Sequence, residues 1–415
     1  MPEAGQTPSG IFFVYSGTPQ TSKRKDREMD FNFTSEQIEL RRKAREFAEK
    51  EIGPMAHELD STNDVPAEGL NRLKKSGFYA YVVPREYGGK GVSSINLCIL
   101  REEFAKVSSF LDEAFVMQGL GSYPIVVNGT EEQKKKYLTP LVDGSRTANF
   151  CLTERSSGSD VAGIRSTARL EGDHYILNGI KCYVSRPGDT DISTVFAKTD
   201  PKAGGKGISA FIVDRAVSKY RAETRQLIAE GNIGEIFMED MKVPKENLLG
   251  KEGEGMRISL GNLSIFRPTV GAATLGMAHC ALSLAINHAK QRDMFGQKLG
   301  DFQVTQFKLA EMKIQLDAAS LLIYRAAWLA DNPTSERTTL EASAAKFYAT
   351  ETAHKIVDQS LQIHGGIGLH KSSRIEHLYR AVRSPRIYEG ASEIQLLVVG
   401  RELLKREYLT SDKRL

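Results

Sequence analysis

A single carboxylate, Glu389, stands where the sequence could aim it at a substrate. It precedes Gly390 in the segment 386–395, and a new helix is predicted to start at Ser392. A carboxylate held on a tight Glu-Gly turn has a fixed direction, so it can serve as a general base towards one C–H bond. The same pattern also fits a solvated glutamate beside a glycine chain break. The role of Glu389 therefore depends on the segments upstream.

Small polar residues crowd the segment 151–160, which reads Cys-Leu-Thr-Glu-Arg-Ser-Ser-Gly-Ser-Asp. Successive hydroxyl and glycine residues expose hydroxyls and backbone N–H groups, which suits a phosphate or the polar edge of a ring. An ordinary loop rich in turn formers is the alternative. Further along, Tyr183 and Ser185 alternate onto one side of a predicted strand. Arg292 follows a predicted helix, where a guanidinium could hold a pyrophosphate.

Composition narrows the classes of function. The chain has 415 residues, with 56 Lys and Arg against 52 Asp and Glu. This near-balance, without a basic patch, argues against nucleic-acid binding. Four widely spaced cysteines and eight histidines without ligand spacing argue against disulfides and metal sites. No apolar stretch is read as long enough to span a bilayer. A reducing compartment is expected: the cytoplasm, or the mitochondrial matrix in a eukaryote.

The length predicts two or three domains. Residues 1–28 are interpreted as a disordered extension, since they are rich in Pro, Gly, Ser and Thr and lack the order of a signal peptide. Helical patterns dominate residues 29–146, strand patterns occupy residues 147–250, and helical periods return over residues 251–415. The order is therefore helices, a small β domain, then a helix bundle.

Local signals mark several elements within these domains. Thr34 and Gln37 form a capping-box start for the first helix. The dipeptides Gly172-Asp173 and Asn178-Gly179 are hairpin signals between β-rich runs. Long helices are predicted over 256–265, 274–290, 304–329 and 340–363, and a final one from Ser392 to about Lys405.

Taken together, these segments resemble the acyl-CoA dehydrogenase family in their order and spacing from about residue 31 to 408. Segment 387–395 is similar to the family's catalytic-glutamate motif, and segment 152–160 to its flavin and substrate loop. Arg155-Ser156 stands where the family usually has Pro-Gly. The segments 84–91, 243–250 and 362–366 are also similar to the family's sequence. The resemblance implies an α+β fold with an N-terminal helical domain, a central small β-barrel or sandwich domain, and a C-terminal four-helix bundle.

The resemblance also implies a chemistry: FAD, an acyl-CoA thioester, and removal of two hydrogens from adjacent carbons. Glu389 would take the α-proton while a hydride leaves the β-carbon for the flavin. The backbone N–H of Glu389 and a flavin ribityl hydroxyl would stabilise charge on the thioester oxygen. Burial beside the flavin is expected to raise the pKa of Glu389 towards neutrality. An electron-transfer flavoprotein would reoxidise the flavin.

Site residues carry over from the family position by position. Those implied to contact FAD are Leu152, Thr153, Gly158, Ser159, Tyr183, Ser185, Arg292, Phe295, Gln303, Gln362, Gly365, Gly366, Ala391 and Glu393. Those implied to contact substrate are Ser159, Arg267, Tyr388, Gly390 and Arg401. For Arg267, a structural ion pair is the alternative. The group from Arg292 to Gly366 matches residues that reach FAD across a subunit interface, which implies an obligate oligomer, usually a dimer of dimers.

Several departures from the family bear on the substrate. Some relatives carry the base at the position of Phe266, which cannot accept a proton, so the choice falls on Glu389. Leu263 and Ser264 replace residues that often contact the CoA adenine, and Ala391 replaces a frequent Thr. Leu111 stands near the position where glutarate-specific relatives have an arginine that binds the distal carboxylate. A leucine there disfavours a glutaryl substrate. Asp112 and Glu113 are interpreted as a solvated helix start, with entry into the acyl pocket as the alternative.

Three readings of the function remain open at this point. The leading one is an acyl-CoA dehydrogenase coupled to an electron-transfer flavoprotein. The second keeps the fold and the flavin but changes the chemistry: an oxidase, a monooxygenase-like enzyme, or a reductase of 2-enoyl thioesters on CoA or a carrier protein. The third is a non-catalytic assembly protein, which would have no need of an aimed carboxylate.

Overall fold

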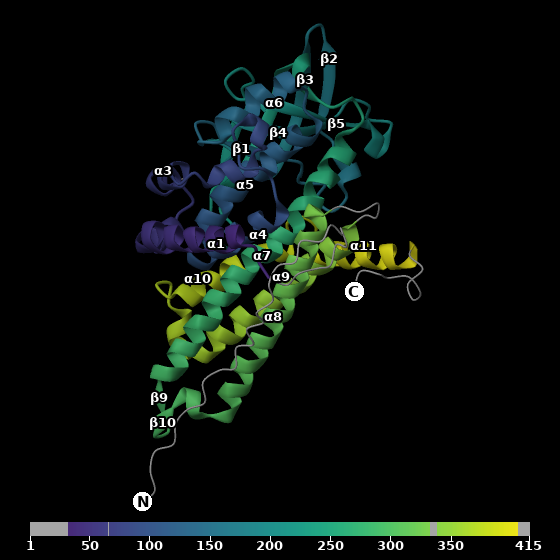
Figure 1. Cartoon of the computed structure of the whole chain (residues 1–415). Helices are drawn as coiled ribbons and strands as arrows, with labels where there is room; N and C mark the ends of the chain where they lie inside the picture. The colour runs from purple at the N-terminus through teal and green to yellow at the C-terminus, as the bar shows by residue number, and fades with distance from the viewer. Residues whose placement is uncertain (1–31, 65, 333–337, 406–415) are drawn as a thin grey trace, which may run out of the picture.

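The computed structural model describes residues 32–64, 66–332 and 338–405, so the predicted extension 1–28 lies outside the described residues. Figure 1 shows the strands of residues 148–249 gathered at one end of the molecule, while the long helices α7 (Gly255–Gln291), α8 (Gln303–Asp331) and α9 (Thr339–His364) extend away from them. Two short strands, β9 (Asp293–Met294) and β10 (Gln297–Lys298), lie at the other end. The predicted succession of a helical region, a β region and a second helical region is confirmed.

The N-terminal region consists of helices packed around α4. Its main helices are α1 (Ser35–Phe47), α3 (Ala67–Lys75), α4 (Ser94–Val107), α5 (Ser109–Asn128) and α6 (Glu131–Leu138). The capping box predicted for α1 is present, because Thr34 and Gln37 each accept a hydrogen bond from the other's backbone N–H. Helix α4 packs against α1, α5, α7 and α8, so most of its residues are buried, charged ones included.

The β region forms one mixed sheet of eight strands. These are β1 (Ala148–Cys151), β2 (Thr167–Glu171), β3 (His174–Ser185), β4 (Ile192–Lys198), β5 (Ile208–Asp214), β6 (Arg221–Arg225), β7 (Ile233–Pro244) and β8 (Leu248–Leu249). The order is β6-β7-β3-β2-β4-β5-β8, with β1 parallel to β4 at the side of this path. Strand β1 packs against α5, so the sheet and the N-terminal helices share one hydrophobic core.

Of the two hairpin signals, one is confirmed and one is wrong. Gly172-Asp173 turns β2 into β3 as predicted. Asn178-Gly179 instead lies inside β3, where the register with β7 shifts by one residue. Gly179 has φ 143°, and a Cβ there would lie 2.2 Å from Ser166 Oγ. The glycine therefore allows a bulge and a close approach within the strand rather than a chain reversal.

The C-terminal region is built on three long helices. They are α7 (Gly255–Gln291), α8 (Gln303–Asp331) and α9 (Thr339–His364), followed by α10 (Arg374–Ala381) and α11 (Ser392–Lys405). A small hairpin, β9 (Asp293–Met294) and β10 (Gln297–Lys298), joins α7 to α8. The separate helices predicted over 256–265 and 274–290 are one continuous helix, and Pro268 is accommodated within α7. At Gly276, α7 and α4 approach so closely that a Cβ would lie 2.2 Å from Glu102 O.

Helix α7 is also long and apolar enough to cross a membrane by length and composition, with a mean hydropathy of 1.5 in its most apolar window. The prediction that no stretch has this length is therefore wrong. Of that window, 72% is buried inside the protein. Its apolar character is explained by packing against α4, α8 and α9.

Candidate active site

Glu389 lies on a turn with two successive left-handed residues. It has φ 53°, and Gly390 has φ 94°. A non-glycine residue in this region stores about 1–3 kcal/mol of strain, which persists only where surrounding contacts hold it. Gly390 cannot be replaced freely, since a Cβ there would lie 2.4 Å from Gln395 Nε2. The turn is short and ends at α11, as the sequence predicts.

Side chains from two helices hold this turn. Lys346 Nζ, from α9, donates to Gly390 O at 2.8 Å. Gln395 Nε2, from α11, donates to Gly390 O at 2.9 Å and to Glu389 O at 3.1 Å. Both side chains are fully buried. One turn and a half along α9, Glu351 accepts hydrogen bonds from Arg386 Nε at 2.8 Å and Ser392 Oγ at 2.5 Å, on either side of the turn.

The carboxyl group of Glu389 is enclosed but available. Its Oε2 atom has no solvent contact and no hydrogen-bond partner, although the residue as a whole is only half-buried. Burial raises the pKa of Glu389, as predicted. Three cations oppose this rise, and Arg101 is the strongest of them, ahead of Lys346 and Arg267. Burial in turn lowers the pKa of Lys346 to about 8.

Asp112 is buried, so its interpretation as part of a solvated helix start is wrong. Arg101 Nε and Nη2 donate to Asp112 Oδ1 and Oδ2 at 2.8 Å each, and Nη1 donates to Thr269 Oγ1 at 3.0 Å. Both charged residues are less than 5% exposed. The guanidinium also interacts with the hydroxyl of Tyr388, whose pKa is raised by burial. A paired cation therefore lies beside the residue that precedes Glu389.

The other predicted substrate contacts divide by burial. Arg267, on α7, is buried, and its Nε atom has no hydrogen-bond partner. Burial lowers its pKa, and the nearby carboxylate of Glu389 opposes that shift. The alternative role of Arg267 was a structural ion pair. Among the described residues, Arg267 forms no ion pair. Ser159 and Arg401 are exposed.

The predicted flavin loop 152–160 is tied firmly to β3. Thr153 O accepts from Cys182 N at 2.9 Å, and the buried Lys181 Nζ donates to Glu154 Oε1 at 2.7 Å. Arg155, which with Ser156 stands in place of the family's usual Pro-Gly, forms a bidentate ion pair with Glu235 on β7, with both distances 2.6 Å. The loop therefore has a fixed position on the sheet despite its glycine and serine content.

Backbone strain gathers at the predicted cofactor contacts. Among the described non-glycine residues, positive φ occurs at Tyr183, Arg186, Asp240, Phe295 and Glu389. Three of these five are predicted site residues, and Arg186 directly follows Ser185. The residues Tyr183 and Phe295 are 66% and 88% exposed. Exposed aromatic rings held in strained conformations suit stacking or edge contact with a flat cofactor.

Of the other predicted FAD contacts, Ala391 and Glu393 lie just after the Glu389 turn, at the start of α11. Those within 292–303 and 362–366 form a second group, far from Glu389. Arg292, Phe295 and Gln303 surround the β9–β10 hairpin, and His288 stacks on His364 at 4.6 Å, which brings the end of α9 alongside. Gln362, Gly365 and Gly366 are exposed there, with open space where a Cβ would stand on either glycine. A helix rises 1.5 Å per residue, so Arg292 lies about 37 Å along α7 from Arg267. One chain therefore does not bring the two groups together.

The sequence missed Arg101, Lys346 and Gln395. Arg101 follows the apolar run 97–100, and Lys346 follows two alanines in a helix whose face is buried. A charge inside an apolar pattern was the available signal for both. Among the described residues, no cluster of His, Cys, Asp and Glu could hold a metal ion.

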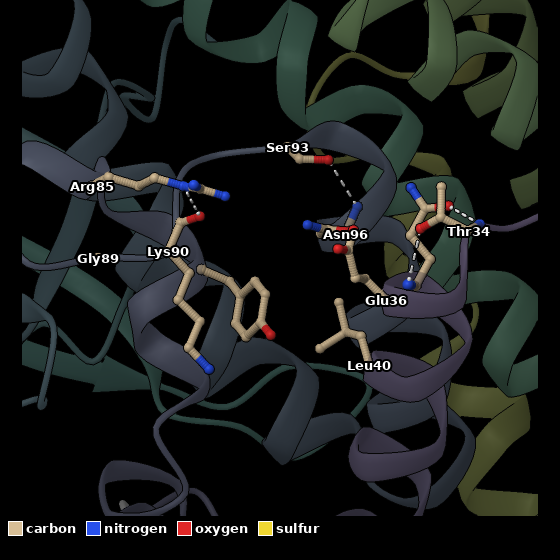
Figure 2. A pocket seen from close by; sticks show the side chains of 10 residues that line it. Thr34, Glu36, Leu40, Arg85, Gly89, Lys90, Ser93 and Asn96 are labelled. Atoms are coloured by element: carbon tan, nitrogen blue, oxygen red, sulfur yellow. Dashed lines mark hydrogen bonds between the residues drawn. The ribbon is translucent and has the colours of Figure 1, made fainter. Parts of the chain in front are cut away.

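A surface cavity of about 700 Å³ lies elsewhere, between α1, the start of α4 and the loop around Lys90. Figure 2 shows Arg85 and Lys90 on one side of it and Glu36, Leu40 and Asn96 on the other. None of the predicted site residues lines this cavity, so it is separate from the site around Glu389.

Comparison with models of known protein families shows to which family the chain belongs. The models of the acyl-CoA dehydrogenase N-terminal, middle and C-terminal domains match residues 34–145, 149–241 and 253–404. The chain belongs to the acyl-CoA dehydrogenase family. The resemblance and the α+β fold class inferred from sequence are thereby confirmed. Members of this family are flavoprotein oxidoreductases, and FAD is the cofactor.

Three similar proteins illustrate the range of the acyl-CoA dehydrogenase family. The chain is 42% identical to a 3-(aryl)acrylate reductase of Clostridium sporogenes, over 90% of its own length and all of the relative's. It is 39% identical, with the same coverage, to the caffeyl-CoA reductase–Etf complex subunit CarC of Acetobacterium woodii. A solved acyl-CoA dehydrogenase of Bacillus anthracis complexed with FAD matches with a TM-score of 0.82 and 33% identity, over 90% of this chain and 68% of that one.

Proposed function

We propose that this acyl-CoA dehydrogenase family enzyme transfers two hydrogens between FAD and the α and β carbons of an acyl thioester. The observation that carries the proposal is the enclosed, unpartnered Oε2 of Glu389 on a strained turn held by Lys346 and Gln395. A buried carboxyl group with a raised pKa can both take and give a proton near neutral pH.

Each residue near Glu389 has a definable part in this reaction. FAD, when bound, would supply the hydride chemistry at the β carbon. Glu389 exchanges the proton at the α carbon through Oε2. Its backbone N–H donates to no acceptor among the described residues and is free to bind the thioester oxygen as charge develops there. Arg101, Lys346 and Arg267 limit how tightly Glu389 holds the proton, so the group can release it again.

The relatives favour the reductive direction. The C. sporogenes and A. woodii proteins, at 42% and 39% identity, are both named as reductases of unsaturated aryl substrates. We therefore propose that this chain saturates a 2-enoyl thioester, with electrons from an electron-transfer flavoprotein, and that Glu389 acts as the proton donor. The predicted dehydrogenation is the reverse of the same chemistry and remains the second candidate, in keeping with the B. anthracis dehydrogenase.

An oligomer would complete the cofactor site. The predicted FAD contacts around Arg292 lie about 37 Å along α7 from Arg267, which interacts with Glu389, so a second copy would be needed to bring them to an FAD bound beside Glu389. Helix α8 also carries an exposed apolar stripe of Val304, Phe307, Ile314 and Leu321. The last three recur every seven residues, the spacing of a helix–helix seam. We propose that this stripe packs against another copy, in a dimer or a dimer of dimers.

Anaerobic absorbance of the flavin tests the reaction and its direction. Butyryl-, isovaleryl- and 3-phenylpropionyl-CoA are added to the oxidised enzyme, and crotonyl- and cinnamoyl-CoA to the dithionite-reduced enzyme. Bleaching by a saturated thioester demonstrates dehydrogenation, and faster recolouring by an unsaturated one supports reduction. Glu389→Gln is expected to keep FAD and oligomeric state while slowing both at least about a hundredfold. The exposed carboxylate variant Glu132→Gln is the matched control. Wild-type rates in Glu389→Gln would overturn the proposed mechanism.

A further inference from the structure

Glu235, on β7, is a buried carboxylate that two arginines share. The residue is 5% exposed. Arg155 Nε and Nη2 donate to its Oε1 and Oε2 atoms at 2.6 Å each. Arg225 Nε and Nη2 both donate to Oε2, at 3.0 and 2.5 Å. Hydrogen bonds between ionised partners are about twice as strong as neutral ones, so this carboxylate is a firm anchor for both side chains.

The two arginines reach Glu235 by different routes. Arg225 lies on the edge strand β6, opposite Ile233 of β7, which is two residues from Glu235. Strand pairing alone therefore places Arg225 beside Glu235. Arg155 is 80 residues from Glu235 in sequence and belongs to the loop 152–160. Its ion pair is thus a tertiary contact that ties the predicted flavin loop to the sheet.

The residue before Arg155 fixes the same loop to a second strand. Glu154 accepts hydrogen bonds from the fully buried Lys181 of β3 at 2.7 Å and from two backbone N–H groups at 2.6 and 3.0 Å. Strand β3 is the neighbour of β7 in the sheet. Two successive loop residues of opposite charge therefore bind two neighbouring strands. Two such attachments restrict the orientation of the loop as well as its position.

The loop needs this restraint because its own sequence supplies little. Small residues follow Arg155, namely Ser156, Ser157 and Gly158, and they leave the backbone many conformations. The family usually has a proline at the position of Arg155, and the ring of proline fixes φ at about −65°. Arg155 has no such ring. Its ion pair with Glu235 is the restraint that this chain has in the same place.

We propose that Glu235 is a positioning residue of the flavin loop: through Arg155 it holds residues 152–160 in the arrangement that binds FAD. The inference rests on the proposed function only in assigning FAD to this loop, where Thr153 and Ser159 are the predicted contacts. A loop that is already ordered loses less conformational freedom when the cofactor binds. Releasing Arg155 from Glu235 therefore weakens FAD binding, even though Glu235 itself makes no predicted contact with FAD.

Retention of FAD by the full-length holoenzyme tests this role. Wild type, Arg155→Met and Glu235→Gln are diluted in series, and the fluorescence of released FAD gives its Kd. Both variants are expected to fold. Arg155→Met leaves Glu235 paired with Arg225, and in Glu235→Gln the freed side chains of Arg155 and Arg225 are 59% and 46% exposed to water. Each variant should raise the Kd about tenfold, as expected for loss of one charge-assisted hydrogen bond.

A restored proline separates positioning of the loop from direct contact between Arg155 and FAD. The double change Arg155→Pro with Ser156→Gly recreates the family's usual Pro-Gly and should bring the Kd within about threefold of wild type. Arg221→Met, at an exposed arginine of β6 that is paired with Glu223, is the matched control and should leave the Kd unchanged. A Pro-Gly variant as weak as Arg155→Met, or a wild-type Kd in Glu235→Gln, would overturn the role of Glu235.

Trypsin gives a second readout that does not depend on activity, because it cuts after arginine. In holoenzyme kept saturated with FAD, cleavage after Arg155 is followed by mass spectrometry, with cleavage after Lys202 in an exposed turn as the internal reference. Glu235→Gln should speed the first cut at least about fivefold relative to the second. Equal relative rates would show that Glu235 does not hold the loop. If no thioester bleaches the wild-type flavin, the proposed function fails, while the Kd values and the cleavage rates still decide the role of Glu235.

Discussion

Lys346→Met would test whether the clamp on the Glu389 turn sets the rate of reaction. The variant removes the 2.8 Å bond from Lys346 Nζ to Gly390 O and leaves the bond from Gln395 in place. A hydrogen bond from a charged donor is worth about 1.5–3 kcal/mol. If the turn is held in its strained form by this bond, the maximal bleaching rate should fall about ten- to hundredfold. KM should change by no more than about threefold, since Lys346 is expected to make no substrate contact.

Stability and pH separate this effect from misfolding. Met has a similar length and leaves no buried charge behind, so the free energy of unfolding should be unchanged or higher. Burial lowers the pKa of Lys346 to about 8, so the folded enzyme loses this proton well below the ordinary range of lysine. The wild-type rate should therefore change near pH 8, and the change should be missing in Lys346→Met. Lys355→Met, at an exposed position of the same helix, is the matched control.

Stopped-flow bleaching at saturating thioester, with urea unfolding of the same preparations, measures both quantities. A Lys346→Met enzyme with the wild-type rate and the wild-type pH profile would refute the positioning role. A variant that is slow but also much less stable would show that Lys346 supports the fold instead.

Three further outcomes are expected. Asp112→Asn leaves the buried Arg101 charge without its partner and should lower the free energy of unfolding by about 3–5 kcal/mol; the double change Arg101→Met with Asp112→Leu should restore most of it, and equal losses in both would contradict the pairing. Phe307→Asp, on the exposed face of α8, should yield smaller particles in light scattering and lose FAD on gel filtration; an unchanged particle mass would exclude this face as an interface. Burial raises the pKa of Asp60, but Arg374 and His377 lower it more, so the folded-state pKa lies below the ordinary value of 3.8. The ionised Asp60 therefore stabilises the fold above pH 3.8, and this stabilisation is lost as the pH falls through the folded-state pKa. Asp60→Asn should therefore flatten the acid limb of stability measured by urea unfolding between pH 2 and 6.

The sequence by itself determined the local elements and the order of the chemical segments. The capping box at Thr34, the turn at Gly172-Asp173 and the start of α11 at Ser392 depend on neighbouring residues, and all three are present as predicted. Such signals are short-range, so the sequence contains them completely. The turn at Glu389 and Gly390 belongs with them, because a glycine before a helix start is a local pattern. Where a glycine serves a distant contact, as Gly179 does against Ser166, the same reasoning failed.

Only the tertiary structure decided which groups surround Glu389. Arg101 comes from α4, Arg267 from α7 and Lys346 from α9, and no spacing in the sequence relates them. The same packing buried Asp112 against Arg101 and enclosed the Oε1 atom of Glu113 without a hydrogen-bond partner. The pKa of an ionisable group depends on its burial and on the charges near it in space, because desolvation and Coulomb interactions depend on distance and not on position along the chain. Glu389 could therefore be predicted as the candidate base from a motif, whereas the direction of its pKa shift required the folded molecule.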